Sequence, residues 1–137
     1  MGQKHGETHL TIEDKILIVE GRGPWNLESI THTNIDPLNN KQKEVLLKSK
    51  WAVLVIAHGD SMFVPDARQL LVDIVKEDIK VGRVATAVVV QNCLSPIFIS
   101  DHLTAIYSDA GDQVESFTSI EQAKQWLNQQ VEDALCN

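Results

Sequence analysis

The run from Trp51 to Ala57 constrains the fold more than any other part of the sequence. It contains seven consecutive apolar residues, several of them β-branched. A run of this length cannot cross a bilayer, for which a helix needs about 20 apolar residues. An uninterrupted apolar run rich in β-branched residues is typical of a central parallel strand that is covered on both faces. We therefore predict a buried strand that ends at His58-Gly59-Asp60.

The segment after this strand alternates between helices and strands. Pro65 suits the first turn of a helix, because its missing N–H costs nothing there, and Gly82 ends that helix. Val84 to Val90 is a second buried strand, a further helix follows it, and Gln113 to Phe117 is a short last strand. Thr118 to Glu121 has the pattern of a capping box, which predicts a final helix. The three helices are expected to turn the following residues inward: Ala67, Leu70, Leu71, Ile74 and Val75; Phe98, Ile99, Leu103, Ile106 and Tyr107; Ile120, Ala123, Leu127, Val131 and Ala134.

The segment before Trp51 begins with a predicted hairpin. Thr8 to Glu13 alternates between apolar and polar residues, and Ile16 to Val19 is apolar on both faces. The connection between them is too short to cross over a sheet, so the two strands are expected to pair antiparallel. Asn26 can cap a first helix, which extends toward Ile35.

These elements predict an α/β fold with a mixed, mostly parallel β-sheet, an N-terminal antiparallel hairpin and about four flanking helices. The three strands from Trp51 onward are joined by helices, which implies right-handed parallel crossovers. The sequence contains no internal repeat and no break in composition. We therefore expect residues 1–137 to form a single domain, with residues 1–7 as a flexible tail.

The charge of the chain argues against several classes of function. There are 12 Lys plus Arg against 19 Asp plus Glu, so the formal net charge is −7. Such a balance repels phosphate backbones and anionic lipid, so nucleic-acid binding is disfavoured, and no membrane span is expected. Cys93 and Cys136 form neither a disulfide framework nor a zinc pattern, and the polar start of the chain contains no apolar signal sequence. We therefore expect a cytoplasmic protein.

Three segments carry a resemblance to a known family. Gly23-Pro24-Trp25-Asn26 follows the hairpin, Trp51-Ala-Val-Leu-Val opens the central strand, and Phe117-Thr-Ser-Ile-Glu-Gln-Ala-Lys-Gln-Trp126-Leu127 spans the last strand and helix. In this combination roughly residues 8–135 resemble the SpoIIAA-like (STAS/SEC14-type) family of small bacterial proteins. The resemblance implies the SpoIIAA-like (STAS) fold with the architecture predicted above. It also implies a regulatory role, because the anti-sigma factor antagonists of this family bind protein partners. Related domains hold lipids or regulate transporters.

The resemblance also implies a candidate modification site. In the anti-sigma factor antagonists, a serine after the central parallel strand is phosphorylated, which switches binding to a kinase-type partner. Ser61 stands in the corresponding stretch of this sequence. The antagonists' signature has an Asp-x-Ser-x-x-Asp-Ser-x-Gly character, whereas only one Asp-Ser pair is present here, and Asp60 and Asp66 oppose an added negative charge. Ser61 is therefore a candidate phosphorylation switch, and an ordinary loop hydroxyl is the favoured alternative.

The catalytic and metal-binding motifs are incomplete. His58, Asp60 and Ser61 are residue types of a hydrolase triad, but Phe63 stands where a Gly-x-Ser-x-Gly turn needs its second glycine. Gly21-Arg22-Gly23 lacks the third glycine of a dinucleotide fingerprint. The five histidines are scattered, without an HExxH or CxxC spacing. The sequence therefore indicates a protein that is not an enzyme, with no cofactor and no metal site.

Apolar residues outside the predicted core indicate where a partner would bind. Met62, Phe63 and Val64 are adjacent in a loop and cannot easily all point inward, and Trp25 either covers one end of the sheet or is partly exposed. We expect a non-enzymatic regulatory or interaction domain that binds a protein partner or forms a homodimer. The alternative is a carrier or sensor of a small apolar, lipid-like ligand, held between a helix and the sheet near Ile97 to Leu103. The candidate interaction surface consists of Trp25, His58, Gly59, Asp60, Met62, Phe63 and Val64.

Overall fold

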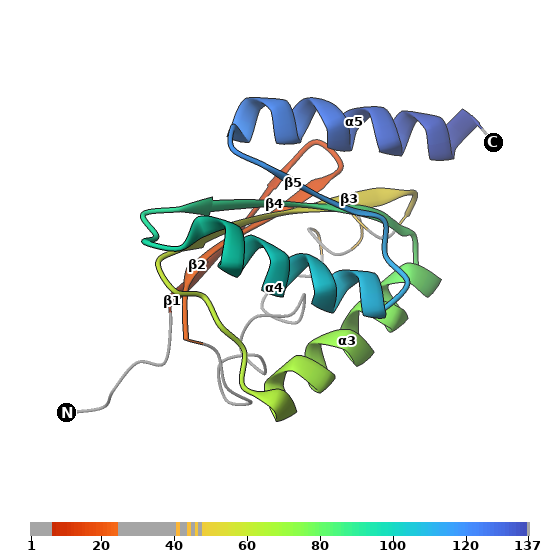
Figure 1. Cartoon of the computed structure of the whole chain (residues 1–137). Helices are drawn as coiled ribbons and strands as arrows, with labels where there is room; N and C mark the ends of the chain where they lie inside the picture. Colours follow the sequence, from red (N-terminus) through yellow and green to blue (C-terminus); the bar gives the residue numbers. More distant parts are fainter. Residues whose placement is uncertain (1–6, 25–40, 42–43, 45, 47, 137) are drawn as a thin grey trace.

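The computed structural model describes residues 7–24, 41, 44, 46 and 48–136. In this part of the chain, five strands form one sheet in the order β1-β2-β3-β4-β5 (Figure 1). β1 is antiparallel to β2, and each later strand is parallel to the one before it. The elements are β1 (Glu7–Glu13), β2 (Ile16–Arg22), β3 (Trp51–His58), α3 (Pro65–Lys80), β4 (Arg83–Gln91), α4 (Pro96–Asp109), β5 (Val114–Phe117) and α5 (Ile120–Cys136).

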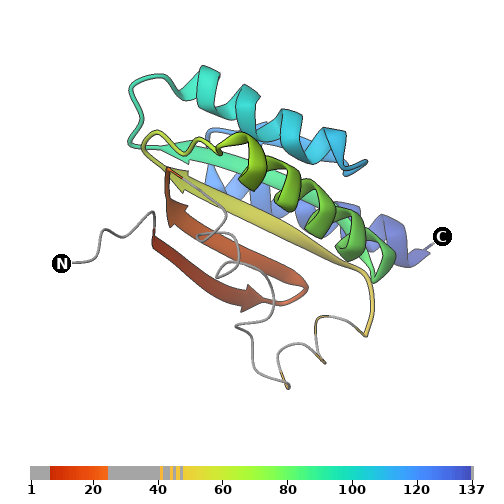
Figure 2. The same cartoon turned by 90° about the horizontal axis from the view of Figure 1, so that it is seen from below.

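Helices cover both faces of the sheet. α5 lies on one face, and α3 and α4 lie side by side on the other (Figures 1 and 2). The α/β class, the antiparallel hairpin and the parallel strands predicted from the sequence are confirmed. Within the described residues three helices flank the sheet, and the first helix expected after Asn26 lies outside those residues, as does Trp25.

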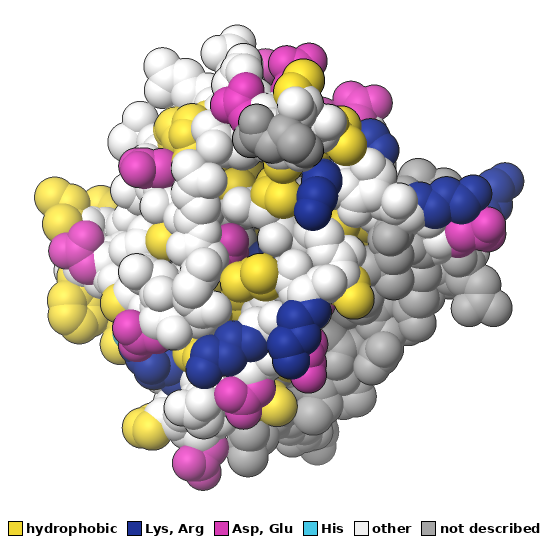
Figure 3. All heavy atoms as spheres, turned by 90° about the vertical axis from the view of Figure 1, so that its right-hand side faces the viewer, with side chains coloured by type: hydrophobic (Ala, Val, Ile, Leu, Met, Phe, Trp, Pro, Cys, Tyr) yellow, Lys and Arg dark blue, Asp and Glu magenta, His cyan; other side chains and the backbone are white. Residues whose placement is uncertain are grey.

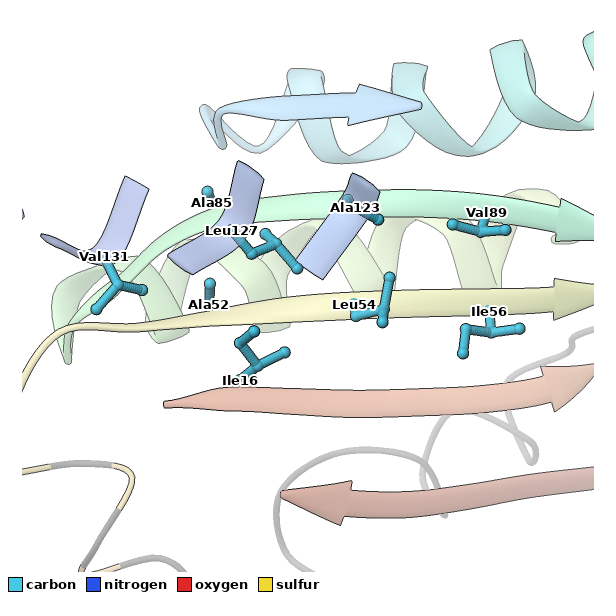
Figure 4. Close-up of a cluster of buried hydrophobic side chains, with 10 residues drawn as sticks. Ile16, Ala52, Leu54, Ile56, Ala85, Val89, Ala123, Leu127 and Val131 are labelled. Carbon is cyan, nitrogen blue, oxygen red and sulfur yellow. The ribbon is translucent and has the colours of Figure 1, made fainter. Parts of the chain in front are cut away.

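The core between the sheet and α5 explains why β3 is apolar throughout. Leu54 and Ile56 of β3 point toward α5, where Leu127 lies between the small side chains of Ala52 and Ala85 (Figure 4). Small residues on the strands let the helix approach closely, and the larger residues of the helix then fill the space at the density of a protein interior. Alternate residues of β3 face the other side of the sheet, where Trp51 and Val53 join Leu17 and Leu46 in a second apolar cluster, so both sides of this strand must be apolar.

The opposite face of the sheet packs against α3 and α4, and here the predicted stripe of α3 is displaced. Ala67 and Val75 are buried as expected, but Val72 takes the buried position between them. Leu71 and Ile74 are only partly buried, because both border a cavity beside the helix. The stripe predicted from spacing alone therefore has the right period, but its centre is displaced toward Val72.

The end of α3 and the start of α5 lie close to the positions that the sequence predicts. Gly82 follows α3 with φ +112°, and a Cβ atom there would lie 2.5 Å from the carbonyl oxygen of Ser49, so a side chain is excluded. At the start of α5, the Oγ of Ser119 accepts a hydrogen bond from the N–H of Gln122 at 3.3 Å. The capping residue is therefore Ser119, one position after the predicted Thr118.

The contrast between two leucines of α5 gives a test of this core. Leu127 is fully buried and Leu135 is 49% exposed on the same helix. We expect Leu127→Ala to lower the free energy of unfolding by about 2–5 kcal/mol, because it leaves a cavity in the core. Leu135→Ala makes the same chemical change in the same helix, and its effect should stay within about 0.5 kcal/mol. Urea denaturation followed by circular dichroism measures both. Equal losses would contradict the packing described here.

Candidate functional site

The carboxyl ends of β2, β3 and β4 bring a chain of polar side chains together. The Nε2 atom of His58 lies 2.7 Å from the Oε2 atom of Glu20. On the other side of the ring, Nδ1 of His58 lies 3.1 Å from the Nδ2 atom of Asn92. Both nitrogens of the imidazole therefore have partners within the protein. The arrangement links the ends of three neighbouring strands through side chains.

Ser61 lies inside the molecule. Its side chain is fully buried, its hydroxyl donates to the carbonyl oxygen of His58 at 3.0 Å, and it accepts from the N–H of Gly23 at 3.2 Å. Ser61 lies 38 positions from Gly23 and three positions from His58, so its hydroxyl joins two distant segments of the chain. A phosphate at this position needs both hydrogen bonds to break and the loop to open. Phosphorylation of Ser61 stays a prediction, and it requires the loop to open first.

The other residues of the predicted interaction surface divide into two groups. Met62 and Phe63 pack against the core under α3 and α4, so they mainly cover the interior. Asp60 is exposed, and Val64 is 46% exposed just before α3 begins. Gly59 has φ +68°, which turns the chain out of β3 into this loop. The loop therefore offers a partner less apolar surface than its sequence indicates.

His102 of α4 holds the loop in place. Its Nε2 atom accepts a hydrogen bond from the backbone N–H of Phe63 at 3.0 Å, and the two rings stack with centroids 6.3 Å apart. Burial lowers the pKa of His102 below its ordinary value of 6.5, and the charge of Arg68 on α3 lowers it further. Arg68 in turn forms an ion pair with Asp109 of α4. Protonated His102 could not accept the hydrogen bond of Phe63.

We expect this contact to make the loop sensitive to pH. The unfolded chain binds the proton of this imidazole more readily than the folded chain, so the free energy of unfolding should fall as the pH drops below about 6.5. Amide hydrogen exchange at residues 59–64, corrected for the intrinsic rate, should be faster at acid pH than at neutral pH. In His102→Gln, a side-chain carbonyl can accept the same hydrogen bond without titrating, so the pH dependence should be smaller. An unchanged pH profile in this variant would refute the contact.

A second apolar surface, which we call the α4 patch, consists of Leu94, Ile97 and Phe98. These side chains are 99%, 77% and 61% exposed. The inward position predicted for Phe98 is wrong, whereas Ile99 and Leu103 are buried as predicted. Phe98 precedes Ile99 and therefore points about 100° away from the buried stripe. In Figure 3, hydrophobic side chains project at the left margin, which is the side of the molecule where α4 lies.

The α4 patch lies next to the loop that the sequence singled out. The Sγ atom of Cys93 lies 3.4 Å from the Oδ1 atom of Asp60, which joins the two loops at the left of Figures 1 and 2. A hollow of about 260 Å³ lies between the first turn of α4 and the end of β5, and Val90, Ile97 and Phe117 contribute to its walls. The patch thus combines projecting apolar side chains with a recess beside them. The sequence signal for it is the absence of any Asp, Glu, Lys or Arg from residue 84 to residue 100.

An apolar cavity of about 80 Å³ lies between the sheet and α3. Val55 of β3, Phe63 of the loop and Leu71 of α3 form part of its wall, and Asp78 and Arg83 reach it from the amino-terminal end of the parallel strands. The cavity therefore has a polar end and an apolar body, which is the usual composition of a small-molecule site.

Arg83 stands at the centre of a buried ionic cluster. Its guanidinium group donates to Asp78 at 3.0 Å, to Asp112 at 3.2 Å and to Thr86 at 2.6 Å, and it lies 5.4 Å from the ring centroid of Tyr107. Burial raises the pKa of Asp78, although Arg83 opposes the shift, and burial raises the pKa of Tyr107 to about 12. Within the described part of the chain, Oδ1 of Asp112 is buried with no hydrogen-bond partner.

The comparisons with known proteins assign no family. No protein-family model matches the chain, and no curated protein matches it. No helix within residues 7–24 and 48–136 is long and apolar enough to span a membrane. Among the same described residues, no three His, Cys, Asp or Glu side chains are grouped so that they could hold a metal ion.

Proposed function

We propose that the chain is a SpoIIAA-like (STAS) domain that regulates another protein by binding it, in the cytoplasm and without catalysis. The mixed α/β sheet with its antiparallel start supports this proposal, together with the sequence resemblance over roughly residues 8–135. The observation that carries it is the α4 patch, in which Leu94 is 99% exposed beside Ile97 and Phe98.

The exposure of the α4 patch needs an explanation other than folding. Burying one large apolar side chain gains about 1.5–3 kcal/mol, and none of the three residues gains this on folding to the full extent. Single exposed apolar residues are normal, but a group of them beside a recess is typical of a binding surface. A partner that covers the α4 patch would recover this free energy. The exposed Val64 and Asp60 of the neighbouring loop lie at the edge of such a contact.

Capture from an extract of the source cell tests this function. Tagged wild-type chain and the variant Leu94→Ser/Phe98→Ser serve as baits, and bound proteins are quantified by mass spectrometry. Two buried apolar contacts are lost, so we expect any specific partner to fall by at least about tenfold. Leu135→Ser changes another exposed leucine, on α5, and should retain the partner. Equal capture by wild type and the double variant would refute binding through the α4 patch.

A second candidate function is the binding of a small apolar ligand in the cavity beside α3. The cavity of about 80 Å³ favours it, because Asp78 and Arg83 could orient one polar group of a ligand. The volume also limits the ligand. It is roughly half of the 150 Å³ that accommodates benzene, so a lipid chain would need Phe63 and Leu71 to move.

Native mass spectrometry of the purified protein tests the second function. A ligand would appear as extra mass that is lost on denaturation. Ile74 lines the cavity, so Ile74→Trp should fill it and abolish the extra mass. Val81→Trp is the matched control, because Val81 is 48% exposed just after α3 and does not border the cavity. Extra mass that persists in Ile74→Trp would place the ligand elsewhere, and wild-type protein without extra mass would count against this function.

A further inference from the structure

We infer that the partner of the α4 patch is a second copy of this chain, bound through the same patch in an isologous dimer. This inference rests on the proposed function, in which the α4 patch binds a protein. The charge, shape and area of the α4 patch favour a second copy as the partner.

Charge is the first argument. Each copy carries a net charge of −7, so two copies repel each other unless the surfaces that meet are neutral. An isologous contact brings equal surfaces together, so a charge within the patch would lie close to its own counterpart. The three side chains of the α4 patch lie in the charge-free segment of residues 84–100, and Asp101 contributes a charged group to the wall of the adjacent hollow. The first turn of α4 has no acidic residue, whereas α3 and α5 begin with Asp66 and Glu121.

Shape is the second argument. The patch has both a projection and a recess on the same face, as self-association requires. Leu94 and Phe98 project, and the hollow of about 260 Å³ beside Ile97 is wide enough to take one such side chain. A two-fold axis between the patches would place a projecting side chain of each copy in the hollow of the other. The walls contributed by Val90 and Phe117 make that hollow partly apolar.

Area is the third argument. A large apolar side chain offers about 150–250 Å², so the exposed fractions of Leu94, Ile97 and Phe98 give the patch on the order of 400–500 Å² in each copy. Two copies would bury on the order of 1,000 Å² once the flanking Val64 and Pro96 are included. This area is near the lower limit for a specific interface. The dimer should therefore be reversible, and its population should depend on protein concentration.

Salt distinguishes a second copy from a basic partner. Added salt screens the repulsion between two acidic copies and strengthens apolar contacts, so the dimer should become tighter. A basic partner attracted to the acidic surface would instead bind more weakly as salt increases.

The test is sedimentation velocity of the purified 137-residue chain from about 10 μM to 1 mM, at low and moderate salt. We expect the mass to rise with concentration from 15.3 kDa toward twice that value, and more steeply with salt. Leu94→Ser and Phe98→Ser should each raise the dissociation constant at least tenfold, whereas Leu135→Ser should leave it unchanged. Ile97→Lys and Ile97→Glu should each be monomeric alone, and an equimolar mixture of the two should form dimers. Dimers in the mixture also show that both variants are folded.

The outcomes separate this inference from the proposed function. A wild-type chain that stays monomeric at every concentration overturns the inference, and so does a dimer that Leu94→Ser and Phe98→Ser leave intact. If the chain is monomeric but still captures a different protein through the α4 patch, the inference fails and the proposed function stands. If neither dimerisation nor capture depends on the patch, both fail.

Discussion

The cluster around Arg83 is the interaction on which the arrangement of the helices depends. Arg83 opens β4 and bonds to Asp78 near the end of α3 and to Asp112 in the connection between α4 and β5. One guanidinium group thus fixes both helices of one layer to the sheet. Its removal would leave two buried carboxylates without their counter-ion, and breaking buried pairs of this kind costs about 3–5 kcal/mol.

The two ends of the sheet therefore differ in the forces that hold them. At the amino-terminal end of the parallel strands, the contacts are ionic, buried and short. At the carboxyl-terminal end, the hydroxyl of Ser61 donates to His58, and His102 accepts from the N–H of Phe63, so hydrogen bonds position the loops. α4 is anchored at its last turn, where Tyr107 packs against Arg83, and the α4 patch occupies the opposite end of the same helix. A rigid helix fixed at one end presents the apolar side chains at the other end without first having to order them.

The strands could be predicted from the sequence, whereas the contacts between loops could not. Trp51 to Ala57 could be predicted because a strand buried on both faces has few alternatives. The exposure of Phe98 could not, since a phenylalanine next to Ile99 fits a helical stripe almost as well in either phase. The burial of Ser61 depends on Gly23, 38 positions away, and the role of Arg83 depends on Asp112 after α4. Such pairs come into contact only when the sheet has formed, so the local sequence pattern around either residue does not predict them.

The agreement between strand order and chain order has a consequence for synthesis on the ribosome. Each strand pairs with the strand made just before it, so no strand has to insert between two that are already joined. The helix α5, however, is made after every strand of the sheet, and its 17 residues cover the face formed by Ile16, Leu54 and Val89. The growing chain therefore carries a nearly complete sheet, and one apolar face of this sheet is exposed to solvent until α5 leaves the exit tunnel. During that interval, the exposed apolar face favours aggregation, which chaperones that bind apolar surface counteract.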